Sequence, residues 1–125
     1  MNLRKVAIAK NCGYRTTSFT VPEWKSEVFV REPLHLDFAR YIKTIESINE
    51  NKKTSVREKD ILKIKAEAEL FASVYIDEKG DPVFNKDVDI ESLVKNYGPI
   101  HTRIVNKSID LIGLSEKPIE EAEKK

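Results

Sequence analysis

Alternating apolar and polar positions predict a β-hairpin over residues 16–31. The apolar members stand on either side of a break: Phe19 and Val21 before it, Val28 and Val30 after it. This alternation is typical of strands with one buried face. The break, residues 22–26, is polar apart from Trp24, and Pro22 has no N–H for a strand ladder, so the turn is placed there.

A two-stranded hairpin is marginally stable alone and needs a third strand, helices or a partner subunit over its apolar face. The apolar run Val6–Ala9 is a candidate third strand. Trp24, at the turn, has two interpretations. It is either an anchor in a protein interface, where tryptophan is common, or a lid over one end of a small core.

After Glu32-Pro33 the apolar residues recur at the helical period. Proline is well tolerated at the first position of a helix, so a helix is expected to begin there. One stripe recurs at intervals of four and three: Leu34, Phe38, Tyr41, Ile45 and Ile48. It predicts a helix over residues 33–50 with one apolar face. That face either packs in the core or forms a coiled-coil seam with another subunit.

A second helix is predicted from Ser55 to about Ile76, because Ser55 and Glu58 have the spacing of a capping box. Its last part, residues 70–76, is apolar almost all round and is expected to be the most buried helical segment. Its earlier part alternates in charge, through Lys63, Lys65, Glu67 and Glu69. Those four side chains are interpreted as a solvated, salt-bridged face.

The acidic segment Asp77–Asp81 is predicted to end that helix, with Gly80 as the left-handed residue and Pro82 preventing continuation. A calcium-binding loop is rejected: counted from Asp77, the third position is lysine, the sixth is proline and the twelfth is valine. The following residues 82–84 are expected to form a short extended piece that pairs at a sheet edge.

Two further helices follow, the first capped by Asp87 or Asp89 and the second beginning after Gly98-Pro99 and ending at Gly113. The pattern predicts an α+β fold, mainly α, with an N-terminal β-hairpin, a candidate third strand and about four helices. Residues 1–125 are expected to form one domain. It comprises a hairpin region (1–31), a helical region (33–114) and a flexible charged tail (115–125).

Composition adds limits to possible functions. The 22 basic and 21 acidic residues give a net charge of +1, so no strong field favours nucleic acid or membranes. The first third of the chain is nevertheless basic, which keeps a nucleic-acid-binding regulator as an alternative. No run of residues reaches the length of a membrane span or of a signal-peptide core.

Side chains that could carry chemistry are sparse. Cys12 stands alone, which rules out an internal disulfide and favours a reducing compartment. His35 and His101 have no second histidine, cysteine or paired carboxylate at helical spacing. We therefore expect no enzyme activity, no cofactor and no metal site.

Three segments together resemble the tail assembly chaperone family of long-tailed, non-contractile bacteriophages and prophages. They are the hairpin VPEWKSEVFVRE, the segment VYIDEKGDPVFNKDVDIESL, and the ending SIDLIGLSEKPIEEAEKK. The resemblance covers most of the chain, and residues 33–70 match it only in helical character.

The resemblance implies a non-enzymatic helper that acts in the host cytoplasm and is absent from the mature virion. Such proteins bind the tape measure protein, keep it soluble, and help recruit tail tube protein around it. A homo-oligomer is left open. Candidate contact residues for the client are Trp24, Leu34, Phe38, Tyr41 and Ile45, with the core or a homo-oligomer contact as their alternative role. A structural component of the tail or of head completion is a third possible function.

Overall fold

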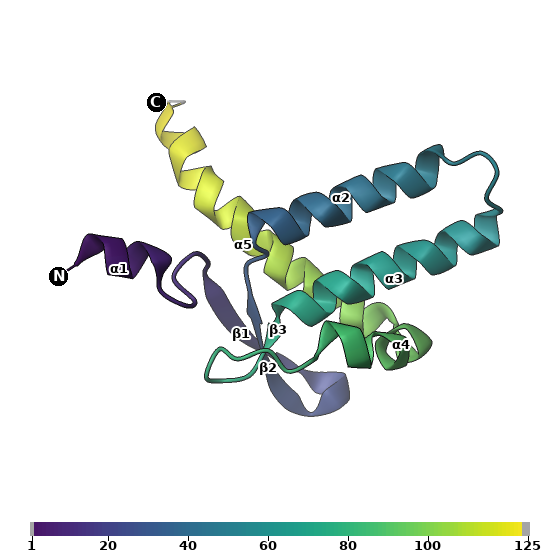
Figure 1. The fold of residues 1–125 in the computed structure, drawn as a ribbon. Helices are drawn as coiled ribbons and strands as arrows, with labels where there is room; N and C mark the ends of the chain where they lie inside the picture. The colour runs from purple at the N-terminus through teal and green to yellow at the C-terminus, as the bar shows by residue number, and fades with distance from the viewer. Residues whose placement is uncertain (1, 124–125) are drawn as a thin grey trace.

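The computed structural model describes residues 2–123, with the side chains of residue 86 and residues 114–123 excepted. The described elements are α1 (Leu3–Ile8), β1 (Thr16–Val21), β2 (Ser26–Arg31), α2 (His35–Glu50), α3 (Val56–Val74), β3 (Tyr75–Ile76), α4 (Lys86–Asn96) and α5 (Pro99–Glu123), with a 3₁₀ turn at Pro22–Trp24. The α+β, mainly α class is confirmed (Figure 1).

The hairpin is confirmed, and the strands form an antiparallel sheet of order β1-β2-β3. Thr17 lies opposite Val30, and Phe19 opposite Val28, so the apolar residues share one face. The turn between the strands contains Lys25 in the left-handed conformation.

The assignment of Val6–Ala9 as a third strand is wrong, because most of this segment lies in α1. Asn2 caps that helix by accepting a hydrogen bond from the Lys5 N–H, and leucine, arginine, lysine and alanine are good helix formers. The third strand is Tyr75–Ile76, which pairs with β2 where α3 ends.

Helices α2 and α3 form an antiparallel pair that projects from the sheet (Figure 1). Ser55 caps α3, accepting a hydrogen bond from the Glu58 N–H at 3.2 Å, as the capping box predicted. The helix ends at Val74, two residues before the predicted end, because the chain turns into β3 there.

The acidic segment after β3 is a turn between extended pieces and does not terminate a helix. Gly80 has a φ of 89°, as predicted, and the Asp77 carboxylate accepts the backbone N–H groups of Lys79 and Asp81. Pro82 forms an isolated bridge with Ile76, which confirms the predicted edge pairing.

The cap of α4 is Asn85, whose side chain accepts from the Asp87 N–H, so the assignment of Asp87 or Asp89 as the cap is wrong. Both aspartates lie in the first turn instead, where their charge favours the positive end of the helix dipole.

The core lies between the inner face of the sheet and the helices, with α5 crossing β1 and β2 (Figure 1). The fully buried side chains at its centre are Val21, Val30, Phe71, Val74, Ile104 and Val105. The prediction that residues 70–76 are strongly buried is confirmed, with Tyr75 as the half-buried exception. Buried Ser108 donates its hydroxyl to the Arg31 carbonyl, which ties α5 to β2.

Helix α5 continues past Gly113 to Glu123, so the prediction that it ends at Gly113 is wrong. Glycine weakens a helix by about 1 kcal/mol without obliging it to stop. The mobility of residues 115–125 stays a prediction, and residues 124 and 125 lie outside the described part of the chain.

Candidate protein-binding cleft

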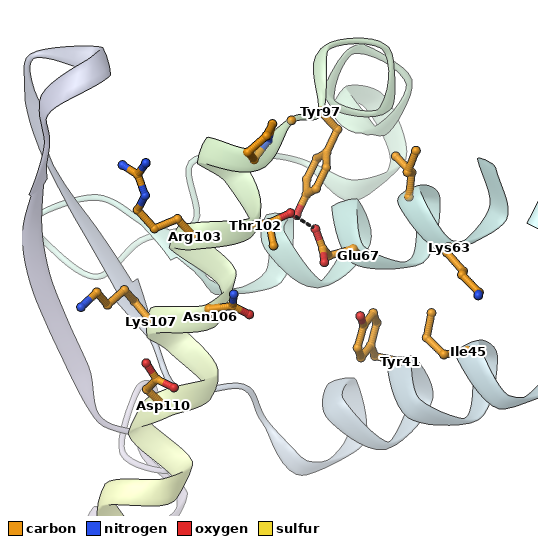
Figure 2. Close-up of a pocket in the computed structure, with 13 residues that line it drawn as sticks. Tyr41, Ile45, Lys63, Glu67, Tyr97, Thr102, Arg103, Asn106, Lys107 and Asp110 are labelled. Atoms are coloured by element: carbon orange, nitrogen blue, oxygen red, sulfur yellow. Dashed lines mark hydrogen bonds between the residues drawn. The ribbon is translucent and has the colours of Figure 1, made fainter. Parts of the chain in front are cut away.

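A cleft of about 870 Å³ lies between α2, α3 and α5. Its existence follows from the helix arrangement: α3 packs against both α2 and α5, while α2 and α5 diverge (Figure 1). The cleft is lined by Tyr41, Ile45, Lys63, Ile64, Glu67, Tyr97, Gly98, Pro99, Thr102, Arg103, Asn106, Lys107 and Asp110. Figure 2 shows Tyr97, Thr102 and Glu67 meeting at the centre of this cleft.

One wall of the cleft is apolar. Tyr41 and Ile45 come from successive turns of α2, and Ile64 faces them from α3. Ile64 is 39% exposed and Ile61, one turn earlier, is 51% exposed, so apolar surface continues from the cleft along α3. These partly exposed side chains form an apolar wall that contact with another molecule would cover.

The centre of the cleft is polar. The Thr102 hydroxyl donates a hydrogen bond to the half-buried Glu67 carboxylate at 2.8 Å (Figure 2). The Tyr97 hydroxyl is buried beside the same carboxylate and the Thr102 hydroxyl. Burial, followed by hydrogen bonding to Glu67 and by the Glu67 charge, raises the pKa of Tyr97 well above its usual value.

The cations around the cleft are directed away from its centre. Both terminal nitrogens of Arg103 donate to Glu23, at 2.8 and 2.7 Å, and these bonds lower the Glu23 pKa to about 2. The Lys107 ammonium lies 5.8 Å from the centre of the Phe19 ring. In Figure 2 both side chains extend toward the β-hairpin, and Lys63 points away from Glu67.

Two of the five residues predicted to contact a client line this cleft, namely Tyr41 and Ile45. Leu34 is 42% exposed and Phe38 is half-buried, and neither lines it. Trp24 packs edge-on against Tyr75 and His101 with 38% of its surface exposed, which is the position of a lid over the core. A client contact at any of the five stays a prediction.

Sequence reasoning missed the polar centre. Glu67 was interpreted as part of a solvated, salt-bridged face; it is half-buried, and among the described residues it forms no ion pair with the lysines of that face. Thr102 and Tyr97 gave no signal, because only tertiary packing brings α3 and α5 together around Glu67. The four-residue spacing of Lys63 and Glu67, with Ile64 between them, places these residues on one face of the helix but does not show that this face lines a cleft.

His101 lies at the boundary of the core, in contact with Trp24, Phe71 and Tyr97. Its Nδ1 accepts the Gly98 N–H at 3.0 Å, which helps close the first turn of α5. Burial lowers the His101 pKa. Within the described residues, no group of three or more histidine, cysteine or acidic side chains is placed to hold a metal ion, and no helix has the length and apolarity of a membrane span.

Comparison with known proteins assigns the chain to a family. The family described as phage tail assembly chaperone matches residues 2–125. The chain belongs to the phage tail assembly chaperone family. Its structure is similar to that of the bacteriophage HK97 tail assembly chaperone, at 33% identity and a TM-score of 0.71, with 88% of this chain and 96% of that chain covered.

The resemblance drawn from the hairpin, the acidic turn and the final helix is therefore confirmed. A search of curated protein sequences gave no match. Family membership places this chaperone in tail assembly, and the matched residues include every element around the cleft.

Proposed function

We propose that this chaperone binds the tape measure protein in the host cytoplasm, keeps it soluble, and helps recruit tail tube protein during assembly. The proposal includes no catalytic step and no cofactor. The observation that carries it is the cleft between α2, α3 and α5, which exposes apolar side chains that a self-contained core would bury.

The size of the cleft fits a helical client. A helix with its side chains is about 10 Å across and rises 5.4 Å per turn, so two turns occupy roughly 850 Å³. The cleft volume is about 870 Å³. A longer helix would leave the cleft at its ends and continue over neighbouring surface.

The chemistry of the walls fits an amphipathic helix. Tyr41, Ile45 and Ile64 would cover an apolar stripe, while Asn106 and Asp110 on α5 would remain beside its polar flank. This is the helix-in-groove mode of recognition, in which anchors at positions i, i+3, i+4 and i+7 enter the groove.

Co-expression tests the proposal. The tape measure protein is produced in bacteria alone, with the wild-type chaperone, or with variants Ile45→Asp and Ile64→Asp. We expect the wild type to raise the soluble fraction of the client severalfold. Each variant should lose most of that effect, since a charge would be placed in the apolar wall.

The matched control is Val88→Asp, an equally non-conservative change at a side chain that is 74% exposed in the first turn of α4. It should retain full activity, and circular dichroism should show that all variants are folded. No gain in soluble client with the wild type would contradict the proposal, as would equal activity of the cleft variants and the wild type.

A further inference from the structure

The Glu67 carboxylate is a negative charge at the centre of a largely apolar cleft. Glu67 is half-buried, Thr102 supplies its hydrogen bond at 2.8 Å, and none of the basic side chains that the structure describes forms an ion pair with it. Covering the cleft with an apolar helix would remove this carboxylate from water with only the neutral Thr102 and Tyr97 hydroxyls as donors, which is unfavourable for a charge without an opposite charge beside it.

Among the described residues, the basic side chains that line the cleft are directed away from Glu67. Lys63 is at the spacing of a helical ion pair with Glu67, yet it points elsewhere (Figure 2). Arg103 is held by both carboxylate oxygens of Glu23, and Lys107 lies over the ring of Phe19. Turning Arg103 or Lys107 toward Glu67 would break its contact with Glu23 or Phe19. Turning Lys63 toward Glu67 would require a different rotamer.

The Tyr97 hydroxyl lies beside Glu67 at the same point. A hydroxyl offers the carboxylate one hydrogen-bond donor and no charge, whereas a group with several N–H donors would also neutralise it.

We propose that the helical segment received by this cleft carries an arginine or lysine within its apolar stripe, and that this side chain pairs with Glu67. The inference rests on the proposed function and specifies the chemistry of the partner. The basic residue would have apolar neighbours three and four positions away, in contact with Tyr41, Ile45 and Ile64. Glu67 would then select among helical segments that are equally apolar.

The test uses the full-length chaperone and overlapping synthetic peptides that cover the tape measure protein, each labelled for fluorescence anisotropy. Peptides bound by the wild type are measured again with Glu67→Gln, which keeps an acceptor for Thr102 and removes the charge. The matched control is Glu69→Gln, the same change on the same helix at a residue that does not line the cleft.

We expect the bound peptides to contain a basic residue in an apolar stripe, and Glu67→Gln to weaken them by about tenfold or more, as for loss of a charged hydrogen bond. Replacing the basic residue by methionine should weaken wild-type binding by a similar factor. The two changes together should cost no more than either one.

Three results would overturn the pairing with Glu67: equal affinity for the wild type and Glu67→Gln, equal weakening by Glu69→Gln, or bound peptides without a basic residue. If the wild type bound no peptide at all, the proposed function itself would fail, and the pairing with it. The two failures are therefore distinguishable.

Discussion

The Tyr97 hydroxyl provides a prediction about the polar centre of the cleft. Tyr97→Phe removes one oxygen, and a change of this kind usually costs stability because a buried hydroxyl normally has a partner. This hydroxyl is buried beside the Glu67 carboxylate, and hydrogen bonding to that carboxylate contributes to the raised Tyr97 pKa. We expect Tyr97→Phe to destabilise the chaperone.

The magnitude follows from the lost interaction. A hydrogen bond to a charged group contributes about 1.5–3 kcal/mol, and Glu67 keeps the Thr102 hydroxyl as a donor in the variant, which places the loss at the lower end of that range. The free energy of unfolding should therefore fall by about 1.5 kcal/mol, which for 125 residues corresponds to about 6 °C in Tm.

Urea unfolding followed by circular dichroism measures this change directly, since a shifted midpoint with an unchanged slope reports stability alone. The control is Tyr14→Phe, which removes a hydroxyl that donates to the neutral side chain of Asn11 in an exposed position and should cost less. An unchanged or increased free energy of unfolding for Tyr97→Phe would refute the reasoning, because it would mean that the hydroxyl forms no net favourable hydrogen bond.

Three further predictions concern the fold that holds the cleft. Phe71→Ala should lower the free energy of unfolding by about 3–5 kcal/mol in a denaturant titration, because Phe71 is 1% exposed and its ring contacts those of Tyr75, Phe84, Tyr97 and His101; a loss below about 1 kcal/mol would contradict that position. Ser55→Ala should cost about 1 kcal/mol in the same assay by removing the cap of α3, and Ser55→Asp should restore stability. Glu23→Gln should destabilise the protein at pH 7, and the difference from the wild type should shrink as the pH falls from about 4.5 to about 2, since the Glu23 pKa is lowered to about 2 in the folded state and its stabilisation is lost through protonation. A difference between Glu23→Gln and the wild type that stays constant from pH 7 to pH 2 would contradict the pairing with Arg103.

Local rules predicted the elements whose signals lie within a few residues. The hairpin follows from alternation around Pro22, and the start of α3 follows from the Ser55 capping box. The Gly80 turn follows from the need for a left-handed residue. In each case the deciding interaction joins residues near one another in sequence.

The errors arose where several local solutions were nearly equal in energy. Val6–Ala9 is short enough to suit a strand or a helix, and the Asn2 cap decided the outcome. Asn85, Asp87 and Asp89 can all cap a helix, and the chain used the first. Gly113 lowers helix propensity without ending α5.

The polar centre of the cleft could not be predicted, because it depends on tertiary structure. Glu67 and Thr102 are 35 residues apart and meet only when α5 packs on α3. The apolar wall was partly predictable, since Tyr41 and Ile45 belong to the helical stripe of α2. Periodicity identifies such a face and does not say whether the protein or a partner covers it.

Site-specific photo-crosslinking tests most directly whether the cleft holds the tape measure protein. A photoreactive amino acid is placed at Ile45 or Ile64 in the cleft, or at Val88 on α4 as the control, and the chaperone is co-expressed with its client before irradiation. We predict crosslinks from both cleft positions to helical segments of the tape measure protein, and little or none from Val88. Crosslinks to the client from Val88 alone, or none from either cleft position while the two proteins still co-purify, would contradict the account.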